Sequence, residues 1–186
     1  MLGIKALGIC GSSRVGGNTE VLLKLCLNEL RRKGVEVEFL RLSDYSIKPC
    51  TGCRECLKRG ECCIDDDMKR VIVPKLLSAS IIVIASPVYF NNVSSYVKIF
   101  MDRTWSIRGR LKDKVGGAIV VGRGYGLAQA LQQIHSFMLK HSMILCHRGV
   151  EARGFNKEEV LEDKEALRLT VELAGRLYEV ALKVAR

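Results

Sequence analysis

The stretch IKALGICGSSRVGGNT, residues 4–19, decides the fold class of this chain. Residues 4–10 form a short apolar run that ends at a glycine, which is typical of a strand buried on both faces of a sheet. Residues 11–19 form a loop of small and hydroxyl residues that leads into a helix. No lysine stands before Thr19, so the Walker motif is absent, and the dinucleotide pattern G-x-G-x-x-G is absent too. The stretch therefore predicts a strand, a loop that favours an anion, and a helix N-terminus.

Strand-like and helix-like segments alternate through the rest of the chain. Pro74 should kink or shorten one of the expected helices, and Asp163 should break the last one. Five strands that alternate with helices indicate an α/β fold, a doubly wound five-stranded parallel sheet of order 2-1-3-4-5 in three layers. The further strands are expected at residues 35–42, 80–86, 115–122 and 143–150, and the helices at residues 19–33, 65–78, 94–103, 126–141 and from 156 onward.

Composition narrows the functional class. The 186 residues suffice to bury a core, and without repeats or linkers we expect one domain, 1–186, with residues 48–64 as a loop inserted after the second strand. No apolar run reaches the ~18 residues of a membrane span, so a cytoplasmic protein without a membrane partner is expected. The net charge is +10, but basic residues are interleaved with acids, which argues against a nucleic-acid partner. The densest basic run, residues 103–114, is expected to be a solvated face.

In a sheet of this order a ligand should bind between the loops after strands one and three, where the strand order reverses. The first loop offers hydroxyls, an amide, one arginine and two glycines, which suits a terminal phosphate; a turn that only caps the helix is the alternative. The second loop, residues 86–95, combines exposed backbone amides with the apolar Val88, Tyr89 and Phe90, which suits a planar heteroaromatic ring; an aromatic pair packed under a loop is the alternative. Together the loops favour a mononucleotide, and FMN fits best.

Three motifs carry a resemblance to a known family. The sequences GSSRVGGNT at 11–19, SPVYFNNVSSYVKIFMDR at 86–103 and GRGYG at 122–126 together resemble the NADPH-dependent FMN reductase group of flavodoxin-like proteins. The resemblance implies a flavodoxin-like fold, FMN phosphate at the first motif, the flavin ring against the second, and the third motif on the remaining side. We therefore expect FMN to bind at Ser12, Ser13, Arg14, Gly17, Asn18, Thr19, Pro87, Val88, Tyr89, Phe90, Asn91, Asn92, Gly124, Tyr125 and Gly126; no side chain is needed as an acid or base.

Five of the eight cysteines stand within residues 50–63, CTGCRECLKRGECC. The spacing C-x2-C-x2-C-x5-C of Cys50, Cys53, Cys56 and Cys62 wraps one region of the chain, as in bacterial ferredoxin loops, and predicts one [4Fe–4S] cluster. Structural zinc is usually bound by two separate C-x2-C pairs, or by one such pair and histidines. Zinc and unmetallated or disulfide-forming cysteines remain the alternatives, and Cys63 could substitute for its neighbour. The other three cysteines read as small core residues.

The cysteine loop narrows the resemblance to the archaeal iron–sulfur flavoproteins, which carry FMN and one [4Fe–4S] cluster per chain. The resemblance implies Cys62 as the fourth ligand and a homodimer or homotetramer in which cofactors of neighbouring chains approach each other. It implies an FMN-dependent oxidoreductase with ferredoxin or NAD(P)H as donor and a small molecule such as a quinone as acceptor. Two rivals stay open: a cluster-free NAD(P)H-dependent FMN or quinone reductase, and a non-enzymatic redox carrier or sensor.

Overall fold

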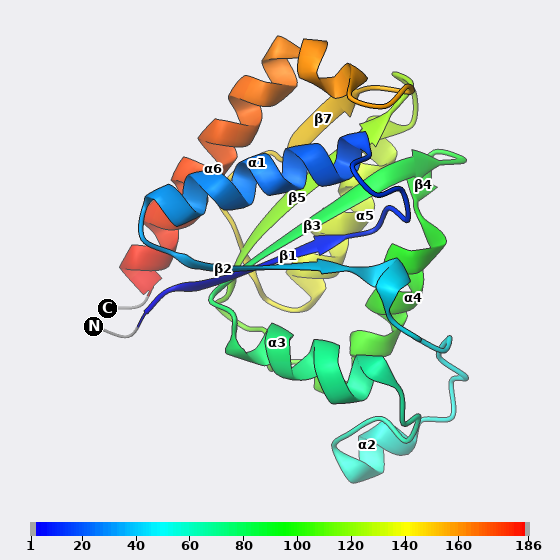
Figure 1. Cartoon of the computed structure of the whole chain (residues 1–186). Coiled ribbons are helices and arrows are strands. Elements are labelled where there is room, and N and C mark those ends of the chain that lie inside the picture. Colours follow the sequence, from blue (N-terminus) through cyan, green and yellow to red (C-terminus); the bar gives the residue numbers. More distant parts are fainter. Residues whose placement is uncertain (1–2, 185–186) are drawn as a thin grey trace.

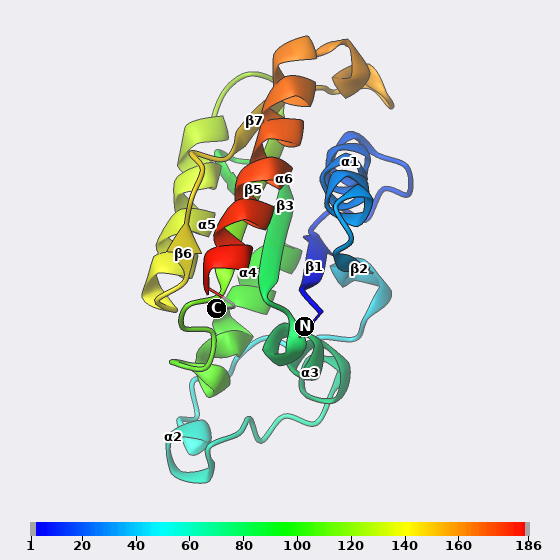
Figure 2. The same ribbon diagram turned by 90° about the vertical axis from the view of Figure 1, so that its left-hand side faces the viewer.

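The structure is a computed structural model that describes residues 3–184. Its centre is a parallel sheet in the order β2-β1-β3-β5-β6, with β7 also paired to β5 and β4 paired to β3. Figure 2 shows β6, β5, β3, β1 and β2 following one another across the molecule. The expected order 2-1-3-4-5 is confirmed. The strands are β1 Lys5–Cys10, β2 Glu36–Arg41, β3 Ile81–Tyr89, β4 Asn92–Val93, β5 Val115–Gly122, β6 Ile144–Leu145 and β7 Val150–Arg153.

Helices cover both faces of this sheet, which makes the three expected layers (Figure 1). Helices α1 and α6 pack on one face, and α3, α4 and α5 pack on the other. The fold is therefore the flavodoxin-like α/β arrangement. The helices are α1 Asn18–Arg32, α2 Glu55–Arg59, α3 Val73–Ser78, α4 Ser95–Arg103, α5 Leu127–Lys140 and α6 Lys164–Val184.

Alternation along the strands explains the two cores. In β1, Ala6 and Cys10 belong to the core under α1 and α6, while Leu7 and Ile9 belong to the core under α4 and α5. Successive side chains of a strand point to opposite faces, so a strand covered on both sides must be apolar throughout. Cys10 and Cys26 are buried in these cores, as expected, and burial raises the pKa of the Cys26 thiol to about 12.

Three expected elements differ from the structure. Strand β3 continues through Tyr89 because its last residues pair with β4 in a hairpin, where we had expected a turn from Pro87 onward. The fifth strand is split into β6 and β7, because the backbone N–H of Gly149 donates to Nδ1 of His147 and closes a turn between them. The helix expected at 65–78 opens with a π-helical turn, Met68–Ile72, before α3, which accommodates Pro74 near the start of α3.

The closing helix confirms the break at Asp163. A single 3-10 turn, Glu159–Glu162, precedes α6, and Oδ1 of Asp163 accepts the backbone N–H of Ala166. Oε2 of Glu159 accepts the backbone N–H of Asn156, which is half of a capping box. Within residues 3–184, no helix is both long and apolar enough to cross a membrane.

Candidate functional site

A cavity of about 730 Å³ lies at the carboxyl ends of β1, β3 and β5. It is formed by four segments of chain, residues 12–19, 87–91, 121–125 and 154–157. Cofactor sites typically enclose ~300–1,000 Å³, and in open α/β sheets they lie where the strand order reverses. The cavity meets both conditions, and it brings together the two loops that the sequence singled out.

The loop after β1 is held close to α4. The backbone N–H of Gly11 donates to the carbonyl of Ala85 at 2.7 Å, and Oγ of Ser94 donates to the carbonyl of Gly11 at 2.8 Å. A Cβ atom on Gly11 would lie 2.2 Å from a methyl group of Val97, so only glycine permits this approach. Ser94 also caps α4 by accepting the backbone N–H of Val97.

One end of the cavity suits an anion. Ser12 and Thr19 are buried there, and within residues 3–184 no side chain caps the N-terminus of α1, where Gly17 is the capping residue. The first backbone N–H groups of a helix carry a partial positive charge and need acceptors. Arg14 lines the cavity, is exposed, and has no acidic partner within the described residues. This end can therefore hold a phosphate group.

A buried carboxylate fixes the conformation of this loop. Glu20 accepts the backbone N–H of Gly16 at 2.7 Å and pairs with Arg41 at 2.5 Å and with Lys24 at 2.6 Å. Burial alone would raise the pKa of Glu20, but the hydrogen bonds from Lys24 and Gly16 hold the pKa below its ordinary value. The charge of Glu20 is thus neutralised by its own partners, and the helix N-terminus keeps its attraction for an anion.

The side chain of Asn18 lines the cavity but is used by the protein itself. Its Nδ2 donates to the carbonyl of Asn156 at 2.7 Å, and its Oδ1 accepts the backbone N–H of Val160 at 3.4 Å. These bonds join the start of α1 to a segment about 140 residues away along the chain. The contact of Asn18 with a phosphate stays a prediction, and these two bonds leave its backbone N–H and the second N–H of Nδ2 for it.

The β3–β4 hairpin supplies the apolar wall. Phe90 and Asn91 form its two-residue turn with φ of 49° and 61°, the geometry that suits a tight hairpin. A bulky residue with positive φ is strained, and such strain is concentrated at functional sites. Phe90 is fully exposed at this tip, and Tyr89 is half exposed beside it. Aromatic surface is thus held open at the mouth of the cavity, where a planar ring could stack.

The loop after β5 closes the third side. Tyr125 lines the cavity, whereas Gly124 and Gly126 line a neighbouring hollow. Gly126 has φ of 71°, and a Cβ atom there would lie 2.6 Å from Cα of Asn91, so glycine lets this loop lie against the hairpin. Two further expected residues stand outside the cavity lining, Ser13 and Asn92; Oδ1 of Asn92 accepts the backbone N–H of Val93.

The structure adds a fourth wall that the sequence did not indicate. Residues 154–157 line the cavity, and the guanidinium group of Arg123 stacks on the ring of Phe155 at 3.8 Å. A cation over an aromatic face is a favourable pair. In the sequence this segment showed only the start of a helix. The other lining residues that were not expected are Val15, Val121 and Gly122.

The cysteine loop lies away from this cavity, and none of residues 48–64 lines it. In both views the loop with α2 extends from the opposite end of the molecule (Figures 1 and 2). Sγ of Cys53 lies 3.5 Å from Sγ of Cys63, and the described residues bring no three ligating side chains together at one metal site. Cysteine sites are commonly completed only when the metal binds. Gly52 and Gly60 have φ of 67° and 71° and provide the tight turns.

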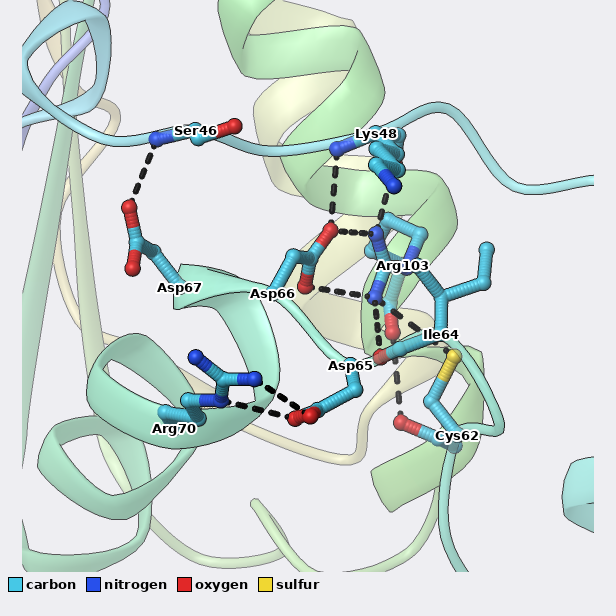
Figure 3. Close-up of polar contacts among 10 residues, drawn as sticks. Ser46, Lys48, Cys62, Ile64, Asp65, Asp66, Asp67, Arg70 and Arg103 are labelled. Atoms are coloured by element: carbon cyan, nitrogen blue, oxygen red, sulfur yellow. Dashed lines mark hydrogen bonds and ion pairs between the residues drawn. The ribbon is translucent and has the colours of Figure 1, made fainter.

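A buried ion pair holds both ends of the cysteine loop (Figure 3). Arg103, at the end of α4, donates to Asp66 at 2.6 and 2.9 Å, to the carbonyl of Lys48 at 2.6 Å and to that of Ile64 at 3.4 Å. Sγ of Cys62 accepts a further bond from Arg103 at 3.5 Å. Burial by itself would raise the pKa of Asp66, but the bonds and charge of Arg103 together with the backbone N–H of Lys48 hold the pKa below its ordinary value.

The acidic residues before α3 bind the start of the cysteine loop. No side chain caps the turn Met68–Ile72. Asp66 instead accepts the backbone N–H of Lys48, and Asp67 accepts that of Ser46. These residues fasten the start of the cysteine loop to its end.

Comparison with known proteins follows this geometry. The sequence profile of the family described as NADPH-dependent FMN reductase matches residues 4–155. An iron–sulfur flavoprotein of Methanocaldococcus jannaschii is 43% identical over 146 residues, which cover 76% of this chain and 75% of the relative. An iron–sulfur flavoprotein of Methanosarcina thermophila is 33% identical over 182 residues, which cover 95% of each chain.

Solved structures share the fold at low sequence identity. RosB, crystallised with 8-demethyl-8-formylriboflavin-5'-phosphate, superposes with a TM-score of 0.81 at 17% identity, covering 98% of this chain and 80% of RosB. A flavodoxin from the domain Archaea superposes with a TM-score of 0.63 at 18% identity, covering 94% of this chain and 99% of that chain.

Proposed function

Because the chain belongs to the NADPH-dependent FMN reductase family, we propose that it is an iron–sulfur flavoprotein in which FMN is coupled to one [4Fe–4S] cluster. That the chain is an FMN-dependent oxidoreductase follows from the family. One observation carries the assignment of the site: a single cavity has an uncapped helix N-terminus at one end and an aromatic hairpin at the other. These ends fit the phosphate and the ring of FMN.

The flavin proposal assigns the residues of each end. Ser12, Arg14, Thr19 and the first N–H groups of α1 hold the phosphate, while Pro87 to Tyr89 with Phe90 and Tyr125 support the ring. Replacing Arg14 and Thr19 together with alanine should weaken FMN binding, measured by flavin fluorescence. Extraction of FAD as the only flavin would contradict the assignment.

The cluster proposal rests on spacing and on the names of the relatives. Cys50, Cys53, Cys56 and Cys62 are the proposed ligands, and Cys63 is the spare thiol. Alanine at any of the four should remove iron and sulfide, whereas Cys63→Ala should retain both. If Cys63→Ala loses iron and sulfide while Cys62→Ala retains them, Cys63 is the fourth ligand and Cys62 is the spare thiol.

The redox partners follow from the chemistry of the two groups. FMN supplies one- and two-electron chemistry, and the cluster supplies one-electron chemistry. A nicotinamide or another redox partner is implied by the family. We propose ferredoxin or NAD(P)H as donor and a small molecule such as a quinone as acceptor. Steady-state assays that vary one donor at a time distinguish the candidate donors. If none of them supports turnover, a redox carrier or sensor is favoured.

The proposed electron path crosses a contact between chains of a homodimer or homotetramer. The support is that no residue of the cysteine loop lines the cavity of its own chain. The loop extends from the opposite end of the ribbon (Figure 1). One-electron reduction of the protein should change the iron–sulfur and flavin absorption bands in linked order. Dilution should dissociate the protein into monomers, which sedimentation can verify, and the two sets of bands should then no longer change in linked order. Linked changes in a monomer would contradict a path between chains.

A second function is favoured by the arrangement of the thiols. Sγ of Cys53 lies 3.5 Å from Sγ of Cys63, which is not one of the four proposed ligands. This arrangement is compatible with a cluster-free NAD(P)H-dependent FMN or quinone reductase. Anaerobic purification with quantitation of iron, sulfide and flavin separates the two, because the cluster-free enzyme would contain flavin without stoichiometric iron and sulfide.

A further inference from the structure

The segment 154–157 is fastened to the loop that receives the phosphate. Asn18 bonds through Nδ2 to the carbonyl of Asn156 and through Oδ1 to the backbone N–H of Val160. On the other side of the segment, Oε2 of Glu159 accepts the backbone N–H groups of Phe155 and Asn156. Three of these bonds hold residues 155 and 156 of the segment over the cavity, and the fourth holds Val160, which follows the segment.

Lys157 extends from this segment over Gly16. A Cβ atom placed on Gly16 would lie 3.5 Å from Cε of Lys157 and 3.9 Å from its Nζ. Gly16 is itself held by the bond from its N–H to Glu20. The ammonium group therefore stands beside the phosphate loop, and Lys157 lines the cavity together with Arg14, Ser12 and Thr19.

The two basic side chains at this end are not paired within the described residues. Neither Arg14 nor Lys157 has an acidic partner within ion-pair distance in the described residues, and the nearby Glu20 and Glu159 are engaged by their own donors. A phosphate monoester carries a charge of about −1.5 to −2 at neutral pH. Arg14 and the partial charge of the helix N-terminus supply about 1.5 positive charges between them.

We propose that Lys157 is a second cationic residue for the FMN phosphate, delivered from the far end of the chain by the segment 154–157. It lies beyond residues 4–155, the part that matches the family profile. The inference rests on the proposed use of this cavity for FMN. It predicts that Lys157 sets the preference for FMN over riboflavin, which has the same ring and no phosphate.

The test compares the two flavins on the full chain after removal of bound flavin. Dissociation constants for FMN and for riboflavin are measured by fluorescence with the wild type, Lys157→Gln and Lys157→Arg. Lys164→Gln is the matched control, since Lys164 is an exposed lysine at the start of α6 that does not line the cavity. Loss of one charge-assisted bond should raise the dissociation constant for FMN about tenfold. Lys157→Arg should restore most of that affinity, and riboflavin binding should stay unchanged.

Two results would overturn the role of Lys157. One is an equal loss for FMN and riboflavin in Lys157→Gln, which would make Lys157 a structural residue of the wall. The other is that the wild type strongly prefers FMN and Lys157→Gln binds both flavins as tightly as the wild type does. Arg14 and the N-terminus of α1 would then suffice for the phosphate. A wild type that binds neither flavin would instead refute the proposed use of the cavity.

Discussion

Arg103 is the residue on which the cysteine loop depends. Its buried guanidinium group contacts the carbonyls of Lys48 and Ile64, one at each end of the loop, as well as Asp66 and the sulfur of Cys62. Arginine suits this place because its planar group donates in several fixed directions, which an ammonium group cannot do. One side chain thereby closes a loop that has little apolar packing of its own.

Removing this side chain should be costly. Arg103→Met leaves the buried carboxylate of Asp66 without its cationic partner, so the free energy of unfolding should fall by about 3–5 kcal/mol. Urea unfolding of the flavin-free chain measures this. Lys98→Met is the control on the same helix, because its pair with Asp102 is exposed and contributes only about 0–1 kcal/mol. An equal fall in the free energy of unfolding in both variants would show that the contacts of Arg103 contribute no more than an exposed ion pair.

The same pair predicts a dependence on pH. The pKa of Asp66 is lowered from its ordinary value of 3.8 in the folded chain, so its stabilising contribution is complete above that value. The contribution is lost as pH falls through the lowered pKa, because the unfolded chain then binds the proton more readily. The stability difference between the wild type and Asp66→Asn should therefore be constant near neutral pH and shrink in acid. A difference that grows in acid would contradict the assignment.

At the scale of elements, the β3–β4 hairpin exposes aromatic surface at a cost in conformational stability. Its tip places Phe90, an aromatic residue, at a positive φ that asparagine or glycine adopts more easily. The loop after β5 supports the hairpin through Gly126, whose missing side chain leaves room for Asn91. The hairpin is thus held in place by backbone contacts while its side chains face the cavity.

Phe90→Asn should separate the two roles. We expect the free energy of unfolding to rise by about 0.5–1 kcal/mol, since asparagine relieves the backbone strain. FMN binding should weaken because the ring loses part of its apolar wall. Chemical unfolding and flavin titration of the same variant check both effects. A variant that loses stability while it keeps its FMN affinity would show that Phe90 serves the fold.

At the scale of the whole molecule, the cavity joins segments that span most of the chain, from residue 12 to residue 157. A ligand that bridges the loops after β1, β3 and β5 and the segment before α6 binds only the folded state. Binding must therefore stabilise the entire fold and not one loop.

This coupling predicts the size of a thermal shift. FMN at about 100 times its dissociation constant adds about 2.7 kcal/mol. For a chain of this size each kcal/mol raises the midpoint by about 2–4 °C, so a rise of roughly 5–10 °C is expected. Thermal unfolding with FMN and with the same concentration of riboflavin measures it. An equal rise with riboflavin would contradict a phosphate site at the start of α1.

The sequence by itself determined the fold class and two walls of the cavity. The apolar run before Gly11 and the alternation of strands and helices are local patterns, and a parallel sheet places the loops after its strands at one edge. The hydroxyl-rich loop and the aromatic loop were therefore predicted to meet, and they do. The cysteine spacing is local too, and its cluster remains a prediction.

Tertiary structure alone decided the contacts between distant segments. Lys157 lies over Gly16, and Arg103 closes the cysteine loop across 37 to 55 residues of chain. Nothing in the sequence distinguishes Lys157 or Arg103 from the many other lysines and arginines of a chain with net charge +10. Long-range proximity depends on how the layers pack, on which strand neighbours which and on where a helix ends. Single residues carry no local signal of these distances, so only the folded chain shows which cation lies beside the cavity and which one closes the cysteine loop.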